Sequence, residues 1–386
     1  MNYISRSINI EKILQNRSLF LFGPRQTGKT SYIRSELNIP ADRFYNLLDN
    51  RLLFRILADT SIIRQEIEAR DLSNCVVCID EIQKCPQLLN EVHLLIEERN
   101  IRFLLTGSSA RKIKRSGTNL LGGRASFRNF HPFVFPEMRE TGFSMERVLY
   151  NGSLPTHYLS DTPDEGLRSY VDLYLKEEIA AEGLARNLPA FSRFLQVASV
   201  SNTKIINYTN IGSDAGVPRQ TVKQWFQILL DTLLGFELRP FTKTVKRKAL
   251  ETAKFYFFDT GVVRVLRQLK EIFPASADFR EFFEHYIFLE LRAYLDYRLP
   301  GSFLYYWRST SGFEVDFLID GEIAIEVKAA EIIHDKHMKG LKALREEGII
   351  KRSIIVCREE RPRKKEDTEI LPWKMFLEYL WDGRIV

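Results

Sequence analysis

The chain has 386 residues, of which 45% are hydrophobic and 27% charged, and its formal net charge is +6. This length allows roughly two to four domains with sizeable cores, and the composition is that of an ordinary globular protein. The positive balance permits an acidic partner such as nucleic acid without requiring one. The sequence has no apolar run long enough to span a bilayer and no signal-peptide layout, so we expect a cytoplasmic protein without a membrane partner.

The cysteines and the histidine pair give no strong indication of a metal site. The four cysteines do not suggest a disulfide framework. Cys75 and Cys78 have a metal-ligand spacing, but they lie in an apolar run that is better interpreted as a buried strand. His334 and His337 have helical spacing but no further ligands nearby, so we treat them as surface residues.

The first functional pattern follows an apolar run that begins at Ser18. It has the arrangement of a phosphate-binding loop, with a strand before it and a helix after it. We expect its backbone N–H groups and the helix N-terminus to surround phosphate oxygens. Lys29 would reach the β- and γ-phosphates as a catalytic residue, and Thr30 would bind magnesium. The predicted nucleotide-binding residues of this loop are Gly23, Pro24, Arg25, Gln26, Thr27, Gly28, Lys29 and Thr30.

Two later apolar runs also end in polar residues. The first ends at Asp80 and Glu81, and buried parallel strands deliver such side chains to the edge where ligands bind. We expect Asp80 to hold magnesium through water and Glu81 to polarise the attacking water. The second run ends near Thr106 and Ser108, either of which could contact the γ-phosphate or the water. Together these groups supply the positioning and charge that phosphoryl transfer needs.

The stretch LLGGRASFRNF contains candidates for the positive charge that the transition state of phosphoryl transfer needs. It offers Arg124 and Arg128, and Arg124 follows two glycines as an exposed loop residue would. Arg124 is therefore the candidate arginine finger, acting on a neighbouring subunit. A surface arginine without this role is the open alternative.

The loop, together with IDEIQKCP, LLTGSS and LGGR, resembles the AAA-type ATPases whose C-terminal half is a domain of unknown function, DUF4143. The resemblance extends over nearly the whole chain. It implies an AAA-type P-loop domain over residues 1–140 that binds ATP and Mg²⁺. It also implies a homo-oligomer, in many cases a ring, with sites at subunit interfaces.

The middle of the chain is predicted to hold a helical lid or connector at 141–198 and a winged helix at 199–270. Gly216 and Pro218 separate two helical patterns, an arrangement that is typical of a helix-turn-helix. The stretches GFELRPF and KFYFFDTG would be the wing strands. A winged helix used for protein packing is the alternative to DNA contact. The predicted DNA contacts are Arg219, Gln220, Lys223 and Gln224 on the second helix, with Lys243, Lys246, Arg247, Lys248 and Lys254 between the wing strands.

The stretch GFEVDFLIDGEIAIEVKAA, residues 312–330, has the alternating pattern that predicts a half-buried hairpin. A two-residue Asp-Gly turn would mix its apolar and polar faces, so we predict a three-residue loop that pairs Phe317 with Ile325. That register places Asp316 opposite Glu326, with Lys328 on the same face. Like charges directly opposite are unfavourable, which raises the possibility of a divalent cation between them.

A helix, this hairpin, a second helix and a last strand together resemble the PD-(D/E)xK nuclease fold over residues 271–386. The resemblance implies Asp316, Glu326 and Lys328 as catalytic residues. It also implies Mg²⁺ or Mn²⁺ on the two carboxylates, with Glu284 as a further ligand and Glu290 as its alternative. The fold's usual proline is Val315 here, a departure from the pattern. The expected fold class is α/β: a P-loop NTPase, a helical lid, a winged helix and a nuclease-like α/β domain.

Three functions remain open on this basis. The first, which the sequence favours, is an ATP-driven machine that grips and cuts DNA. The second is an ATP-dependent switch or scaffold whose nuclease-like domain binds DNA or a protein partner without cutting. The third is a chaperone-like remodeller of proteins.

Overall fold

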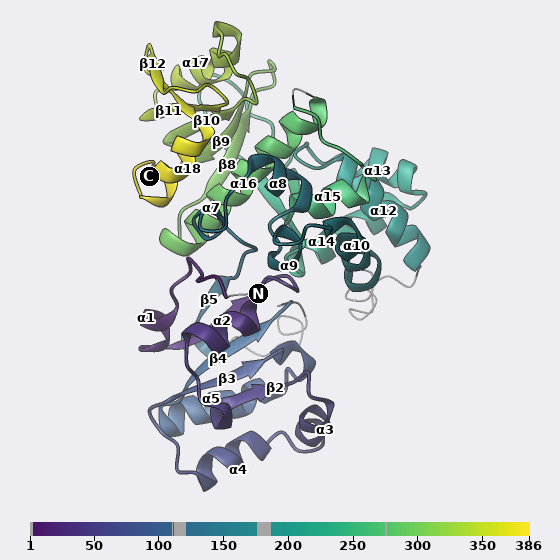
Figure 1. Cartoon of the computed structure of the whole chain (residues 1–386), viewed down its shortest axis with the longest axis vertical. Coiled ribbons are helices and arrows are strands. Elements are labelled where there is room, and N and C mark those ends of the chain that lie inside the picture. The colour runs from purple at the N-terminus through teal and green to yellow at the C-terminus, as the bar shows by residue number, and fades with distance from the viewer. Residues whose placement is uncertain (1–2, 110, 112–120, 176–186, 275) are drawn as a thin grey trace. The chain divides into compact units, whose positions relative to one another are not determined.

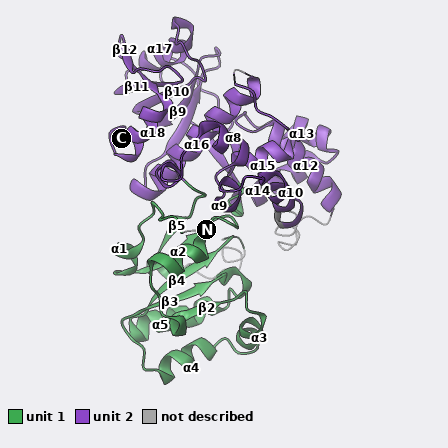
Figure 2. Ribbon diagram, in the orientation of Figure 1, with its two compact units in different colours: residues 1–133, 231–234 green, residues 134–230, 235–386 purple. Residues whose placement is uncertain are grey.

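The computed structural model describes residues 3–109, 111, 121–175, 187–274 and 276–386, and Figure 1 shows the course of the chain. The chain divides into two compact units (Figure 2). Unit 1 comprises Met1–Phe133 and Asp231–Leu234, and unit 2 comprises Val134–Leu230 and Gly235–Val386. In the described part of the chain, no helix combines the length and apolar composition that crossing a bilayer requires.

Unit 1 is built on a parallel sheet with the strand order β2-β3-β4-β1-β5. The central strands are apolar and buried on both faces, as expected of a parallel sheet covered by helices. This confirms the predicted parallel α/β sheet. The strands are β1 (Ser18–Phe22), β2 (Phe44–Asn46), β3 (Val76–Asp80), β4 (Arg102–Gly107) and β5 (Ala125–Asn129).

The helices of unit 1 supply the apolar residues that close its core. Leu88, Val92 and Leu95 of α5 pack with strand residues in one hydrophobic cluster. Cys78 is buried in β3 and Cys75 is half-buried directly before it, both as free thiols, so the strand interpretation is confirmed for Cys78. The described helices are α1 (Glu11–Leu14), α2 (Lys29–Glu36), α3 (Asn50–Ala58), α4 (Ile62–Ala69) and α5 (Leu88–Arg99), with 3-10 turns η1 (Ala41–Arg43), η2 (Ile82–Lys84) and η3 (Leu121–Gly123).

Unit 2 begins with a run of short helices and then the predicted helix-turn-helix. Gly216 ends α13 in the left-handed conformation with φ of 68°, and α14 starts directly after Pro218, which confirms the predicted turn. The described elements here are α7 (Phe135–Arg139), α8 (Met145–Asn151), α9 (Pro155–Tyr158), α10 (Pro163–Ser169), the π-helical η4 (Tyr170–Leu175), α12 (Leu188–Val200), α13 (Tyr208–Ala215) and α14 (Arg219–Asp231).

The rest of unit 2 is organised around a mixed sheet with the order β12-β13-β11-β10-β9-β8-β6-β7. The predicted wing strands β6 (Gly235–Pro240) and β7 (Lys254–Phe257) belong to it, because β6 pairs in parallel with β8. The sheet therefore runs across the boundary expected near residue 270. Its other elements are α15 (Thr260–Leu266), α16 (Ala277–Arg298), β8 (Leu304–Arg308), β9 (Glu314–Ile319), β10 (Ile323–Val327), η5 (Asp335–Met338), α17 (Lys339–Arg345), β11 (Arg352–Cys357), β12 (Arg363–Lys365), β13 (Thr368–Pro372) and α18 (Trp373–Trp381).

The hairpin β9–β10 has the predicted register. Phe317 pairs with Ile325 and Ile319 with Ile323, across a three-residue loop. The expectation of one solvated face was wrong, since both strands are buried almost throughout. Leu318 lies in a core cluster with residues of α17, while the ring of Phe317 is 6.1 Å from that of Phe288 on α16. Helices therefore cover both faces of the hairpin.

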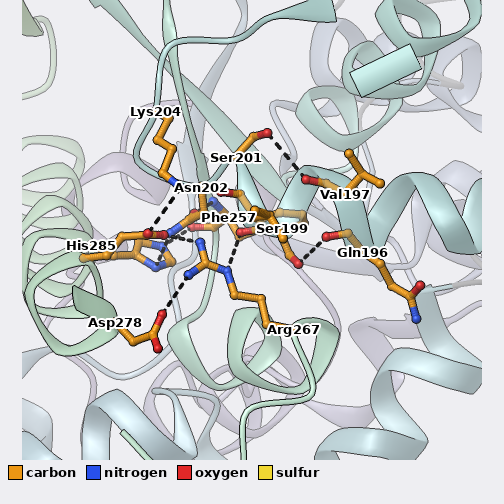
Figure 3. Close-up of polar contacts among 12 residues, drawn as sticks. Gln196, Val197, Ser199, Ser201, Asn202, Lys204, Phe257, Arg267, Asp278 and His285 are labelled. Carbon is orange, nitrogen blue, oxygen red and sulfur yellow. Dashed lines mark hydrogen bonds and ion pairs between the residues drawn. The ribbon is translucent and has the colours of Figure 1, made fainter. Parts of the chain in front are cut away.

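A buried polar network ties β7 to α16 (Figure 3). His285 of α16 contacts the Phe257 carbonyl through Nε2 at 2.7 Å and the Asn202 amide through Nδ1 at 3.2 Å. Since a carbonyl only accepts, Nε2 carries the proton and Nδ1 accepts. Burial lowers the pKa of His285 to about 3, so this ring is neutral at ordinary pH. Beside it, Arg267 donates to the Ser199 carbonyl at 2.7 Å and lies 3.7 Å from Asp278.

Candidate functional site

The phosphate-binding loop connects β1 to α2, as predicted. Gly23 has no space for a side chain, because an added Cβ would lie 2.2 Å from the Phe130 carbonyl oxygen. Gln26 and Gly28 both have positive φ, 63° and 91°, which is typical of loops that present successive N–H groups to an anion. Lys29 is buried, and its ammonium donates to the Gly23 and Pro24 carbonyls at 2.6 and 2.9 Å.

Asp80 at the end of β3 is buried beside the loop. Its carboxylate accepts a hydrogen bond from the Thr30 hydroxyl at 2.9 Å and a second from the Thr106 hydroxyl. Mg²⁺ in nucleotide sites is held by one or two protein oxygens together with phosphates and water, so Thr30 and Asp80 fit this ion. Thr106 lies against Asp80, and its contact with a γ-phosphate stays a prediction.

Glu81 follows Asp80 with an unusual backbone conformation, φ 63° and ψ 43°. Its carboxylate accepts a hydrogen bond from the side-chain amide of Gln83, and the same amide lies 3.2 Å from the Ser108 hydroxyl. Gln83 thus connects the ends of β3 and β4. It fills the space above Gly107, where an added Cβ would lie 2.1 Å from its carbonyl oxygen.

Gln83 was not among the residues singled out from the sequence. The signal available was its position two residues after Glu81 in IDEIQ. Without the structure, nothing indicates that the short η2 turn folds this side chain back onto Glu81 and Ser108.

Of the two candidate arginine fingers, Arg124 lies directly before β5 and Arg128 lies within it. Arg124 has an exposed side chain that pairs with Glu97 of α5. Arg128 donates to the Phe127 carbonyl at 2.7 Å. The action of Arg124 on a neighbouring subunit stays a prediction.

The predicted DNA contacts divide into two groups. Arg219, Gln220 and Lys223 are exposed on the first turns of α14, and the Lys223 ammonium lies 5.5 Å from the ring of Tyr208. In the loop between β6 and β7, Lys246 and Lys248 are also exposed. Both groups have side chains accessible to a phosphate backbone.

Of the basic residues placed on this loop, Lys254 was interpreted wrongly and Arg247 forms an ion pair. The Arg247 guanidinium contacts Glu346 at 2.5 Å and the Ala343 carbonyl at 3.0 Å, so it is engaged by α17 and its flanking residues. Lys254 is the first residue of β7 and only 4% exposed. Its ammonium lies 2.7 Å from Glu314 and 3.5 Å from Glu284, so it neutralises two half-buried carboxylates.

The carboxylates of the hairpin lie in the same buried cluster. Asp316 accepts a hydrogen bond from the Val327 amide at 2.8 Å. The Lys328 ammonium lies 2.5 Å from Glu326 and 3.5 Å from Asp316. One carboxylate oxygen of Glu326 is buried without a hydrogen-bond partner among the described residues. We refer to Lys254, Glu284, Glu314, Asp316, Glu326 and Lys328 as the charge cluster.

The electrostatics of the charge cluster follow from burial and from its two lysines. Burial raises the pKa of Glu326 to about 8 and that of Glu284 to about 7, while the neighbouring lysines oppose both shifts. Burial lowers the pKa of Lys254 and of Lys328, but the surrounding carboxylates raise both values by more. Both lysines are therefore charged.

The charge cluster does not form the predicted three-carboxylate metal site. Among the described residues, no group of three or more His, Cys, Asp or Glu side chains is arranged to hold a metal ion. Lys328 contacts Asp316 and Glu326 and Lys254 contacts Glu284, so the two lysines compensate the charge of these carboxylates. The alternative ligand Glu290 lies elsewhere, since it accepts from the Phe135 amide at 2.9 Å and the Trp381 indole at 2.8 Å.

The raised pKa of Glu326 predicts a pH-dependent stability. Between the ordinary value of 4.5 and about 8, the folded state retains a proton that the unfolded state releases. The free energy of unfolding should therefore fall as pH rises through this window, by up to about 1.4 kcal/mol per unit. Glu326→Gln, which cannot ionise, should flatten the fall in urea unfolding measured from pH 5 to 8.5.

Glu322 provides the matched control, because it is an exposed carboxylate in the same hairpin. Glu322→Gln should leave the pH profile of the wild type unchanged. Equal profiles for Glu326→Gln and the wild type would contradict a protonated Glu326.

Comparisons with known families divide the chain into three segments. Residues 15–139 match the family model described as an AAA domain. Residues 143–272 match a domain of unknown function, DUF8612, and residues 280–376 match another, DUF4143. The AAA match agrees with the loop, the acidic strand end and the parallel sheet of unit 1.

Two mycobacterial relatives are similar over most of the chain. The uncharacterized proteins Mb2031c of Mycobacterium bovis and Rv2008c of Mycobacterium tuberculosis are each 21% identical over 310 residues, which is 78% of this chain and 67% of theirs.

Among solved structures, Aeropyrum pernix ORC1 in complex with DNA is 13% identical with a TM-score of 0.26, covering 66% of this chain and 87% of that one. Drosophila ORC bound to AT-rich DNA and Cdc6 is 12% identical with a TM-score of 0.24, covering 67% and 87%. Scores this low do not establish a shared overall fold. The chain thus has an N-terminal segment that matches the AAA-domain model, followed by segments that match two families of unknown function.

Proposed function

We propose that this protein is an ATP-dependent switch, in which unit 1 binds and hydrolyses ATP and unit 2 binds DNA. The observation that carries the proposal is the convergence of Lys29, Thr30, Asp80 and Glu81 at the carboxyl edge of one parallel sheet. Ligands of open parallel sheets bind at this edge. Phosphoryl transfer requires the positioning and charge stabilisation that these groups offer.

Each residue of the nucleotide site has a role in this proposal. Lys29 exchanges the Gly23 and Pro24 carbonyls for the terminal phosphates. Thr30 and Asp80 hold magnesium, which, when bound, neutralises charge on the phosphates. Glu81 accepts a hydrogen bond from the attacking water, and Gln83 keeps its carboxylate aimed at that water. Arg124 of a neighbouring subunit in a homo-oligomer would supply the remaining positive charge.

DNA is the proposed partner of unit 2 because of the exposed face of α14. Its first turns present Arg219, Gln220 and Lys223 on the second helix of a helix-turn-helix, which is the position that enters a groove in DNA-binding proteins of this kind. Lys246 and Lys248 in the wing loop would contact phosphates. Arg247 is excluded from this set by its ion pair with Glu346.

DNA cleavage by the charge cluster is the second candidate function. The unpartnered oxygen of Glu326 favours it, because a buried carboxylate oxygen normally has a partner. The neutralisation of the cluster by Lys254 and Lys328 argues against it, and this is why binding without cutting is preferred. We derive no catalytic step for this site.

A binding assay tests the proposal. The wild type should bind a fluorescent DNA duplex with an affinity that falls as salt rises and that differs between ATP-bound and ADP-bound protein. Arg219→Ala/Lys223→Ala should weaken binding by roughly tenfold through lost contacts in the groove, and Lys246→Ala/Lys248→Ala should reduce the salt slope by about two, one for each lost phosphate contact. Arg345→Ala, on α17 and paired with Asp367, is the control and should bind normally.

The same reactions separate the alternatives when Mg²⁺ or Mn²⁺ is present and the DNA is supercoiled, linear or branched. Cleavage by the wild type that is absent in Asp316→Ala would establish the second candidate in place of the switch. Equal DNA binding by the wild type and Arg219→Ala/Lys223→Ala would refute the role of α14. A failure to hydrolyse ATP would refute the function proposed for unit 1.

A further inference from the structure

Arg6 lies outside every motif described above, yet its side chain is almost completely buried against the phosphate-binding loop. It is 6% exposed. One guanidinium nitrogen donates to the Thr27 carbonyl at 2.6 Å. The other terminal nitrogen lies 2.8 Å from the His131 carbonyl and 3.1 Å from that of Pro132. A buried cation is costly unless it is fully hydrogen-bonded, and these three backbone carbonyls compensate the burial of the Arg6 guanidinium.

The contact with Thr27 acts on the loop through the geometry of one peptide unit. The chain has no cis peptide bond in its described part, so the Thr27 carbonyl and the Gly28 N–H point in opposite directions. Anchoring the carbonyl therefore directs the Gly28 N–H away from Arg6. In a phosphate-binding loop, backbone N–H groups of this kind are the donors to phosphate. The guanidinium also polarises the peptide, which strengthens that donor.

His131 and Pro132 belong to residues 129–133, through which the chain leaves unit 1 and which we call the exit segment. Arg6 therefore joins the loop to the exit segment. This segment also contacts the first residue of the loop. The Phe130 amide donates to the Phe22 carbonyl at 2.7 Å, and the Phe130 carbonyl occupies the space that a side chain on Gly23 would need. The exit segment therefore meets the loop at Gly23 directly and at Thr27 through Arg6.

Arg6 is itself held firmly. Its guanidinium lies over the ring of Phe130 at 4.4 Å, a cation–π arrangement. Its backbone N–H donates to Glu36 at 2.8 Å, at the last residue of α2, and the Tyr3 hydroxyl donates to the same carboxylate at 2.7 Å. The N-terminal segment is thus fixed at both ends of α2, which begins at Lys29.

We infer that Arg6 is a positioning residue of the nucleotide site that couples the Thr27–Gly28 peptide to the His131–Pro132 backbone. Phosphate bound to the Gly28 N–H would shift that peptide, and Arg6 would pass the shift to the exit segment. This inference rests on the proposed binding of ATP by unit 1. It goes further by naming the residue through which occupancy of the loop is sensed.

Hydrogen exchange with and without nucleotide tests the coupling in the wild type. Bound ATP should slow the exchange of amides in residues 23–30 and also change that of residues 129–133. The absence of any nucleotide binding would refute the proposed function. Nucleotide binding that protects residues 23–30 while leaving 129–133 unchanged would overturn the role of Arg6 alone.

Arg6→Lys is the deciding variant, because it keeps the buried charge but loses the fork that reaches two backbone segments. We expect a near-normal melting temperature, an ATP affinity weakened by roughly tenfold, and a loss of the exchange response at 129–133 with that at 23–30 retained. Arg51→Lys, an exposed arginine on α3, is the matched control and should behave as the wild type. A full response at 129–133 in Arg6→Lys would overturn the inference.

Discussion

Lys29→Ala is expected to lower the rate of ATP hydrolysis by roughly 10²- to 10³-fold, because the lysine is the loop's charge nearest to the terminal phosphates. It should also weaken ATP binding, since Lys29 contacts the phosphates of bound ATP before the reaction as well as in the transition state. In the wild type its ammonium is held at the loop by the Gly23 and Pro24 carbonyls. The measurements are phosphate release under saturating ATP and the affinity for a fluorescent nucleotide.

Glu81→Gln separates the contribution to ATP hydrolysis from the contribution to ATP binding. This variant keeps Lys29, Thr30 and Asp80, so it should bind ATP normally while losing hydrolysis to a similar extent. Lys12→Ala, an exposed lysine of α1, is the control for a lost charge in unit 1. Hydrolysis by Lys29→Ala at the rate of Lys12→Ala would show that the loop is not the site of phosphoryl transfer.

Lys254→Met is expected to destabilise unit 2 by about 1–3 kcal/mol, because it removes a buried ammonium from two half-buried carboxylates. The substitution leaves Glu284 and Glu314 without the ammonium that lies 3.5 and 2.7 Å from them. The Tyr256 hydroxyl, which donates to Glu284 at 2.7 Å, cannot supply the missing positive charge. Urea unfolding of the two proteins at pH 7 measures the difference.

A second substitution identifies the cause of the loss. Lys254→Met/Glu284→Gln removes the ammonium and one of its two carboxylates, and it should recover part of the stability because Glu314 keeps its contact with Arg308 at 3.4 Å. Lys248→Met, in the preceding loop, removes an exposed charge and should have an effect within about 0.5 kcal/mol of zero. A Lys254→Met protein as stable as Lys248→Met would contradict a charge-balancing role for Lys254.

The features that could be predicted from the sequence are those that depend on local pattern. The loop residues from Gly23 to Thr30 stand between a strand and a helix, so their context was visible in the sequence itself. The hairpin register followed from alternation, because a slip of one residue would have exchanged its faces. The turn at Gly216 followed from glycine and proline chemistry.

The features that escaped prediction depend on residues distant in sequence. Lys254 was assigned to a basic loop because its neighbours are basic, and the carboxylates that bury it come from α16 and β9. Arg6 contacts carbonyls of residues 27, 131 and 132, and a carbonyl has no sequence signature. The burial of both hairpin faces depended on α16 and α17 packing on the same strands, which alternation within one strand does not reveal.

The continuous sheet of unit 2 also bears on how this protein could have been assembled in evolution. The pairing of β6 with β8 crosses from the segment that matches DUF8612 into the one that matches DUF4143. A gene fragment ending between them would leave an open strand edge, which promotes aggregation, and would separate Lys254 from its carboxylates. Each segment would therefore need the other, or a substitute with matched strand pairing and matched charges, to complete its sheet. The unit that recombination would have to preserve is the whole sheet rather than either segment.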